Sequence, residues 1–144
     1  MTPLVVDASV VSRWFLPDAD GQGARELLAG RCLFVAPDLL FPELIRLVQR
    51  EVRHGRLRAA QGRRLVADLE HVAVETVSCR ALAADAWALS APGRSVPQST
   101  YLALAARLRT QVCTLDDRLI GSVAGTPVLE ALVRDIRATP DGMS

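Results

Sequence analysis

Short apolar runs alternate with longer amphipathic segments along the whole chain. Runs that are apolar throughout, or that alternate with polar residues, predict strands, and apolar residues recurring every three or four positions predict helices. The predicted strands cover 3–6, 32–36, 71–77, 112–115 and, more weakly, 126–129. The predicted helices cover 9–15, 21–28, 38–54, 58–70, 81–89, a segment that begins at Ser95, and the C-terminal end of the chain.

This order of elements indicates an α/β fold. Strands that alternate with helices are typical of an open, mostly parallel sheet with helices on both faces, a three-layer arrangement. The first strand is apolar on both faces, as strands inside parallel sheets are. At 144 residues, half of them apolar, the chain suits one core, and we expect a single domain over residues 1–144.

Composition excludes several functions that occur on α/β folds. The chain contains no lysine, the residue on which Walker A phosphate loops, receiver-type phosphorylation sites and haloacid-dehalogenase-like phosphatases depend. Its two histidines form no zinc-binding or serine–histidine pattern. No apolar run is long enough to cross a bilayer and no secretion signal is evident, so we expect a cytoplasmic protein with no membrane contact.

Asp7 and Asp116 each follow an apolar strand directly. Ligands of parallel sheets bind at the carboxyl ends of strands, so the two carboxylates converge if their strands are neighbours. Two carboxylates that lie so close together raise each other's pKa unless a cation neutralises them. A hard divalent ion is the natural cation. The alternative is that each aspartate merely caps the helix or turn that follows it.

Glu43 lies on the longest predicted helix, at the seam between its apolar and polar faces. From this position its carboxylate can reach the edge of a cleft beside the sheet. The alternative is an ion pair with Arg46, three positions later, which would need no functional site.

The segment 46–64 is strongly basic, although the net charge of the chain is only +1. Arginine side chains match phosphate oxygens, so the segment predicts contact with a nucleic-acid backbone, and a solvated helix face is the alternative. The residues that we expect to make this contact are Arg46, Arg50 and Arg53.

Four motifs together resemble one family. They are VVDASV near the start, APDLLFPEL, SVPQSTYLALAARL and VCTLDDRL. In order and spacing they are similar to a PIN domain, specifically to the VapC-type toxins of bacterial toxin–antitoxin pairs. The resemblance implies a five-stranded parallel sheet in the order 3-2-1-4-5 and an endoribonuclease that depends on Mg²⁺ or Mn²⁺. It further implies RNA as substrate, a homodimer, and a cognate antitoxin as partner.

The resemblance also assigns roles to individual residues. It makes Asp7, Glu43 and Asp116 the catalytic acids that bind the metal. Ser9 and Thr114 would orient these acids by hydrogen bonds.

Two positions depart from the family pattern. Arg46 stands where an asparagine is expected, and Gln98 where a fourth acid is expected. The Gln98 amide oxygen could still ligate a hard ion weakly, with one negative charge fewer than a carboxylate. Alternatively, Ser95 and Gln98 form the capping box S-x-x-Q at the start of the helix, which is the interpretation we favour because one amide can hardly serve both roles.

Two hypotheses follow. The leading one is a metal-dependent ribonuclease toxin whose site is Asp7, Glu43 and Asp116. The rival, motivated by Gln98 and Arg46, is a weakened or inactive PIN-fold module that binds RNA or antitoxin. Cleavage of DNA by the same chemistry also stays open, because no residue in the sequence is identified as a reader of the 2′-hydroxyl.

Overall fold

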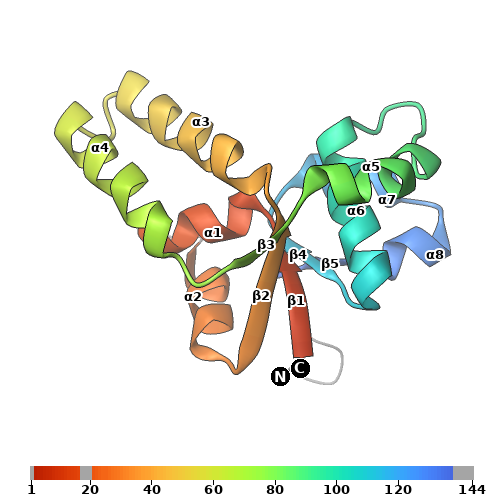
Figure 1. Ribbon diagram of the computed structural model, residues 1–144. Coiled ribbons are helices and arrows are strands. Elements are labelled where there is room, and N and C mark those ends of the chain that lie inside the picture. Colours follow the sequence, from red (N-terminus) through yellow and green to blue (C-terminus); the bar gives the residue numbers. More distant parts are fainter. Residues whose placement is uncertain (1, 17–20, 138–144) are drawn as a thin grey trace.

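Five parallel strands form one sheet at the centre of the computed structural model, which describes residues 2–16 and 21–137 (Figure 1). The strands are β1 (Thr2–Val6), β2 (Cys32–Pro37), β3 (Glu75–Val77), β4 (Val112–Thr114) and β5 (Val133–Asp135). Their order is β3-β2-β1-β4-β5, and each neighbouring pair is parallel. The predicted fold class and the strand order implied by the family resemblance are therefore confirmed.

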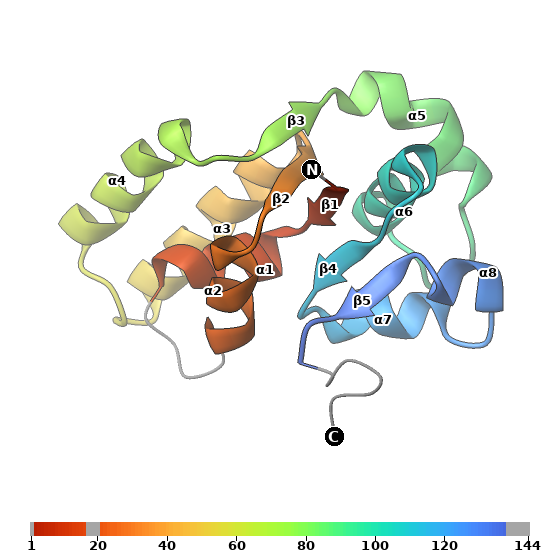
Figure 2. The same cartoon turned by 90° about the horizontal axis from the view of Figure 1, so that it is seen from below.

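Helices cover both faces of this sheet. They are α1 (Ala8–Phe15), α2 (Gln22–Ala29), α3 (Leu40–Arg53), α4 (Ala59–Asp68), α5 (Cys79–Ala88), α6 (Val96–Leu108), α7 (Asp117–Val123) and α8 (Pro127–Glu130), with a short 3₁₀ turn, η2 (Leu69–His71). Figures 1 and 2 show α1 to α4 on one side of the sheet and α5 to α8 on the other. Within the described residues no helix is both long and apolar enough to span a membrane.

The core is built around β1 and α6. Val5 and Val6 of β1 are fully buried, because both faces of this central strand are covered. Helix α6 packs on β1, β2 and β4, and its residues 99–105 are all buried. Burial on this scale fixes the position of α6 relative to the carboxyl ends of the central strands.

The hairpin of α3 and α4 extends away from the sheet (Figure 1). Gly55 has a φ of +76°, a conformation that glycine adopts without strain, and it lies in the turn between the two helices. Gly62 of α4 is buried against α3, where an added Cβ would lie 2.8 Å from Val52 Cγ2. The two helices therefore approach closely at this glycine.

The predictions for the C-terminal part are wrong in two places. Residues 126–129, predicted as a strand, instead begin helix α8, because Pro127 suits the first turn of a helix and cannot donate to a strand ladder. The fifth strand comes later, at Val133–Asp135, where a terminal helix was predicted. The rest of that predicted helix, from residue 138, lies outside the described residues.

Candidate active site at the carboxyl edge of the sheet

Asp7 lies at the carboxyl end of β1 and is buried, with 6% of its surface exposed. Both oxygens of its carboxylate accept hydrogen bonds. Oδ1 accepts from Ser9 Oγ at 2.5 Å and from the Val10 backbone N–H at 3.2 Å, and Oδ2 accepts from Thr114 Oγ1. The Val10 contact makes Asp7 the N-cap of α1, so the capping alternative is correct, but the cap accounts for only one of the three bonds.

The two hydroxyl groups also connect Asp7 to the end of β4. Ser9 Oγ accepts from the Leu115 backbone N–H at 2.9 Å, and Thr114 Oγ1 accepts from the Asp116 backbone N–H at 2.9 Å. Because β1 and β4 are neighbours, this network fixes the first turn of α1 against the connection between β4 and α7. The hydrogen bonds expected of Ser9 and Thr114 are present, while their role in orienting catalytic acids stays a prediction.

Asp116 lies at the same edge and is half-buried. It is the N-cap of α7, and its Oδ1 accepts from the Arg118 backbone N–H at 2.9 Å. As with Asp7, the capping interpretation is correct and leaves the second carboxylate oxygen available for another partner.

Glu43 lies in the first turn of α3 and is half-buried. Its Oε1 accepts a hydrogen bond of 2.7 Å from the hydroxyl of Tyr101, which belongs to α6. The positive end of the helix dipole favours a carboxylate in this turn. Arg46 acts on Glu43 through its charge, whereas Tyr101 makes the hydrogen bond to the carboxylate.

The electrostatics show that the three acids share one region. The pKa of Asp7 is raised to about 6, mainly by burial and also by the charge of Asp116, against the opposing hydrogen bonds from Ser9 and Thr114. Burial likewise raises the pKa of Glu43, opposed by Tyr101 and Arg46, and Asp116 again contributes repulsion. Asp116 therefore repels both other carboxylates, although each comes from a different part of the chain.

The donor atoms fit a hard divalent cation by their chemistry. Carboxylate oxygens are the ligands of Mg²⁺, which commonly takes one or two of them and completes its coordination with water and substrate phosphate. In residues 2–16 and 21–137, no group of three His, Cys, Asp or Glu side chains is arranged to hold an ion together. The chemistry of these donors therefore suits the ion, while the described residues present no preassembled cage of three side chains.

Gln98 caps α6. Its Oε1 accepts from the Ser95 backbone N–H at 2.9 Å, and its own backbone N–H donates to Ser95 Oγ at 3.2 Å. This reciprocal pair is the capping box that the sequence favoured, and that interpretation is confirmed. Because the amide oxygen is engaged at the helix start, the proposed metal site comprises Asp7, Glu43 and Asp116 without Gln98.

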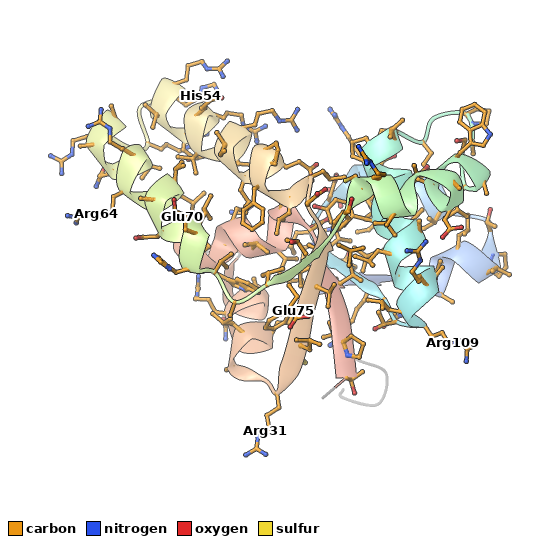
Figure 3. The ribbon with its side chains drawn as sticks, viewed as in Figure 1. Arg31, His54, Arg64, Glu70, Glu75 and Arg109 are labelled. Carbon is orange, nitrogen blue, oxygen red and sulfur yellow. The ribbon has the colours of Figure 1, made fainter. Side chains whose placement is uncertain are left out.

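The arginines of the hairpin lie on its exposed surface. Arg46, Arg50 and Arg53 are all exposed along α3, the helix whose first turn carries Glu43. Figure 3 shows His54 near the end of α3 that lies farthest from the sheet, and Arg64 on the outer side of α4. The helix that carries Glu43 thus also presents three exposed arginines.

Sequence reasoning missed two contacts at this edge. One is the Tyr101–Glu43 hydrogen bond, which joins two helices and which no sequence spacing reveals. The other involves Asp38, whose Oδ1 accepts from the Cys79 backbone N–H at 3.1 Å. Asp38 follows β2 directly, so the rule that selected Asp7 and Asp116 could have found it.

Comparisons with known proteins agree with this architecture. Residues 4–125 match the family model described as PIN domain. The search of curated proteins found no match to the sequence. Among solved structures, VapC20 of Mycobacterium tuberculosis, described as a sarcin–ricin loop cleaving toxin, superposes with a TM-score of 0.62. The two are 20% identical, and the match covers 85% of this chain and 95% of that one, which shows a common fold.

Proposed function

The chain belongs to the PIN domain family, and on this basis we propose that it is a metal-dependent endoribonuclease toxin of the VapC type. The observation that carries the proposal is the placement of Asp7, Glu43 and Asp116 at one edge of the sheet, where Asp116 repels both other acids. Burial of carboxylates that repel one another costs free energy, and a cation shared between them would remove that cost.

Asp7, Glu43 and Asp116 would hold the cation. A bound Mg²⁺ or Mn²⁺ would supply a water of lowered pKa and neutralise the charge that develops on the phosphate. Ser9 and Thr114 hold both oxygens of Asp7 in place, and their hydrogen bonds favour the ionised carboxylate. These residues would thereby keep Asp7 oriented and charged for the reaction.

The substrate would be the RNA backbone. Three arginines, Arg46, Arg50 and Arg53, are exposed on α3. The one acid in the sequence between Arg46 and Arg53 is Glu51, which pairs with Arg56 at 2.5 Å. Because Glu51 already pairs with Arg56, it acts on Arg50 through its charge and leaves the arginine side chains of α3 exposed to phosphate oxygens. We expect them to add affinity that depends on salt and not on base sequence.

We further propose a cognate antitoxin and a second copy of the chain as protein partners, acting in the cytoplasm where cellular RNA is found. An apolar groove of about 550 Å³ between α3 and α4 supports a protein partner. Its lining includes Ile45, Val48 and Val66, side chains that suit an apolar segment of protein better than a phosphate backbone.

The test is cleavage of total RNA by the purified protein with Mn²⁺ and with EDTA. We expect cleavage with Mn²⁺ alone, and a loss of at least about 100-fold in Asp7→Asn, because removing a charge at the reacting centre costs at least as much as removing a supporting hydrogen bond. Thr110→Val, which removes a hydroxyl contact at the other edge of the sheet, serves as the matched control. Equal cleavage by wild type and Asp7→Asn would overturn the proposal.

One observation favours a second candidate, a non-catalytic module that binds RNA or antitoxin. The amide oxygen of Gln98 is engaged in the helix cap, and the side chain brings no charge to the position where the family pattern has an acid. Such a module would bind RNA in EDTA and would show no heat on titration with Mn²⁺ up to millimolar concentration. Micromolar Mn²⁺ binding that is lost in Glu43→Ala would exclude it.

A further inference from the structure

The Tyr101–Glu43 hydrogen bond joins the two helical layers at the carboxyl edge. Tyr101 belongs to α6, on one side of the sheet, and Glu43 to α3, on the other (Figures 1 and 2). The phenol is 3% exposed and donates to Glu43 Oε1 at 2.7 Å. A glutamate side chain has three rotatable bonds, so this single contact fixes a group that would otherwise be mobile.

Helix α6 holds the Tyr101 side chain in a fixed position. Tyr101 lies one helical turn after Gln98, whose capping box fixes the start of α6. Its neighbours Leu102 and Leu104 are fully buried, so the helix cannot rotate without disrupting the core. Gln98 therefore supports Tyr101, although it does not itself reach the acids.

The phenol also stays a donor. Its hydroxyl donates to Glu43 Oε1, and a phenol, with an ordinary pKa of about 10, keeps its proton at neutral pH. Ser9 and Thr114 donate to the two oxygens of Asp7 in the same manner. Asp7 and Glu43 thus each accept hydrogen bonds from hydroxyl groups: Asp7 from Ser9 and Thr114, and Glu43 from Tyr101.

We propose that Tyr101 is the positioning residue for Glu43: its hydroxyl fixes Oε1 and so leaves Oε2 to bind a cation at the carboxyl edge of the sheet. This role rests on the proposed function, because it has a purpose only if Glu43 binds a metal. The competing explanation is structural, in which Glu43 merely satisfies a buried phenol. The two explanations differ in what the loss of the hydroxyl does to metal binding.

Tyr101 is the single tyrosine of the chain, so its Raman bands can be assigned without overlap from another tyrosine. In the metal-free protein, the tyrosine doublet in ultraviolet resonance Raman spectra should report a strong donor in wild type and in Thr110→Val. In Glu43→Ala the doublet should change toward the pattern of a tyrosine that donates a weaker hydrogen bond. An identical doublet in wild type and Glu43→Ala would overturn the proposal, and this comparison needs no change at Tyr101 and does not depend on how Tyr101→Phe folds.

The second measurement is calorimetric titration with Mn²⁺ alone. Tyr101→Phe removes only the hydroxyl, and we expect it to weaken Mn²⁺ binding about 10-fold or more, as loss of a ligand's supporting hydrogen bond does. Thr110→Val should bind Mn²⁺ as wild type does, since Thr110 Oγ1 donates to Pro3 O at the opposite edge. RNA affinity in EDTA should be equal in all three proteins.

Mn²⁺ affinity in Tyr101→Phe within twofold of Thr110→Val would show a purely structural role and overturn the proposal. A wild-type protein that binds Mn²⁺ but cleaves no RNA would instead remove the proposed nuclease function. In that case weakened Mn²⁺ binding in Tyr101→Phe would still support the positioning role. The two failures are therefore distinguishable.

Discussion

The carboxyl edge of the sheet and the α3–α4 hairpin carry opposite charges in opposite settings. At the edge, Asp7 is buried and both of its oxygens are hydrogen-bonded by residues from two strand ends. Along the hairpin, Arg50 and Arg53 are exposed. Buried, fixed charges give large and specific effects when changed, whereas exposed charges give small effects that salt screens.

The difference also shows what each region costs the fold. Desolvation of Asp7 opposes its ionisation and therefore weakens the folded state near neutral pH. The exposed arginines remain hydrated and carry no such cost. A buried acid that costs stability and that a second acid repels is a candidate for a functional role.

Of the substitutions that test this contrast, Asp7→Asn should have the largest effect, and it should change the free energy of unfolding. The pKa of Asp7 is raised in the folded state from 3.8 to about 6, so the native protein binds the extra proton between these values. Wild-type stability should therefore fall as pH rises from about 4 to about 6, and the variant should not share this loss. The unfolding free energy of the variant should gain about 2 to 3 kcal/mol relative to wild type across that window.

Urea unfolding of the metal-free proteins at pH 4, 5, 6 and 7 measures this difference. Thr110→Val removes a hydrogen bond but no titrating group, so its stability should differ from wild type by a constant amount. If the unfolding free energies of Asp7→Asn and wild type changed with pH in parallel, Asp7 would ionise as freely in the folded state as in the unfolded state, which would contradict the prediction.

The next effect concerns the hydroxyl of Thr114. Thr114→Val removes the donor to Asp7 and the acceptor for the Asp116 backbone N–H in one step. RNA cleavage should fall about 10- to 100-fold, as it does when an outer partner of a metal ligand is lost. Thr114→Ser keeps the hydroxyl and should retain most of the activity, and equal losses in both variants would assign Thr114 to packing alone.

The smallest effects are expected on the hairpin. Single changes of Arg46, Arg50 or Arg53 to alanine should weaken RNA binding about two- to fivefold and lower the salt dependence by roughly one ion each. Arg31→Ala is the matched control, because Arg31 is exposed at the opposite edge of the sheet (Figure 3). Filter-binding at several salt concentrations checks this, and an equal effect of Arg31→Ala would show that only net charge matters.

The same contrast explains what could be read from the sequence. Asp7 and Asp116 were predictable because each follows an apolar strand, and the order of elements predicts a parallel sheet that brings strand ends to one edge. The capping box at Gln98 was predictable because it is local. Both inferences use neighbours in the chain, where spacing carries the information.

The features that the sequence did not predict depend on contacts between elements that are distant in the chain. Periodicity places Tyr101 on a buried helix face and Glu43 on a seam, but it does not reveal that they meet 58 positions apart. The strand at Val133–Asp135 was missed because three residues show too little alternation, and its pairing with β4 decides its conformation. These features come from tertiary packing.

The central claim is that Asp7, Glu43 and Asp116 share one cation. Its most direct test is Mn²⁺ titration by calorimetry of wild type and of Asp7→Asn, Glu43→Gln and Asp116→Asn. We expect one ion per chain in wild type and at least about 10-fold weaker binding in each variant. Absence of binding at millimolar Mn²⁺, or binding that two of the three variants leave unchanged, would contradict the claim.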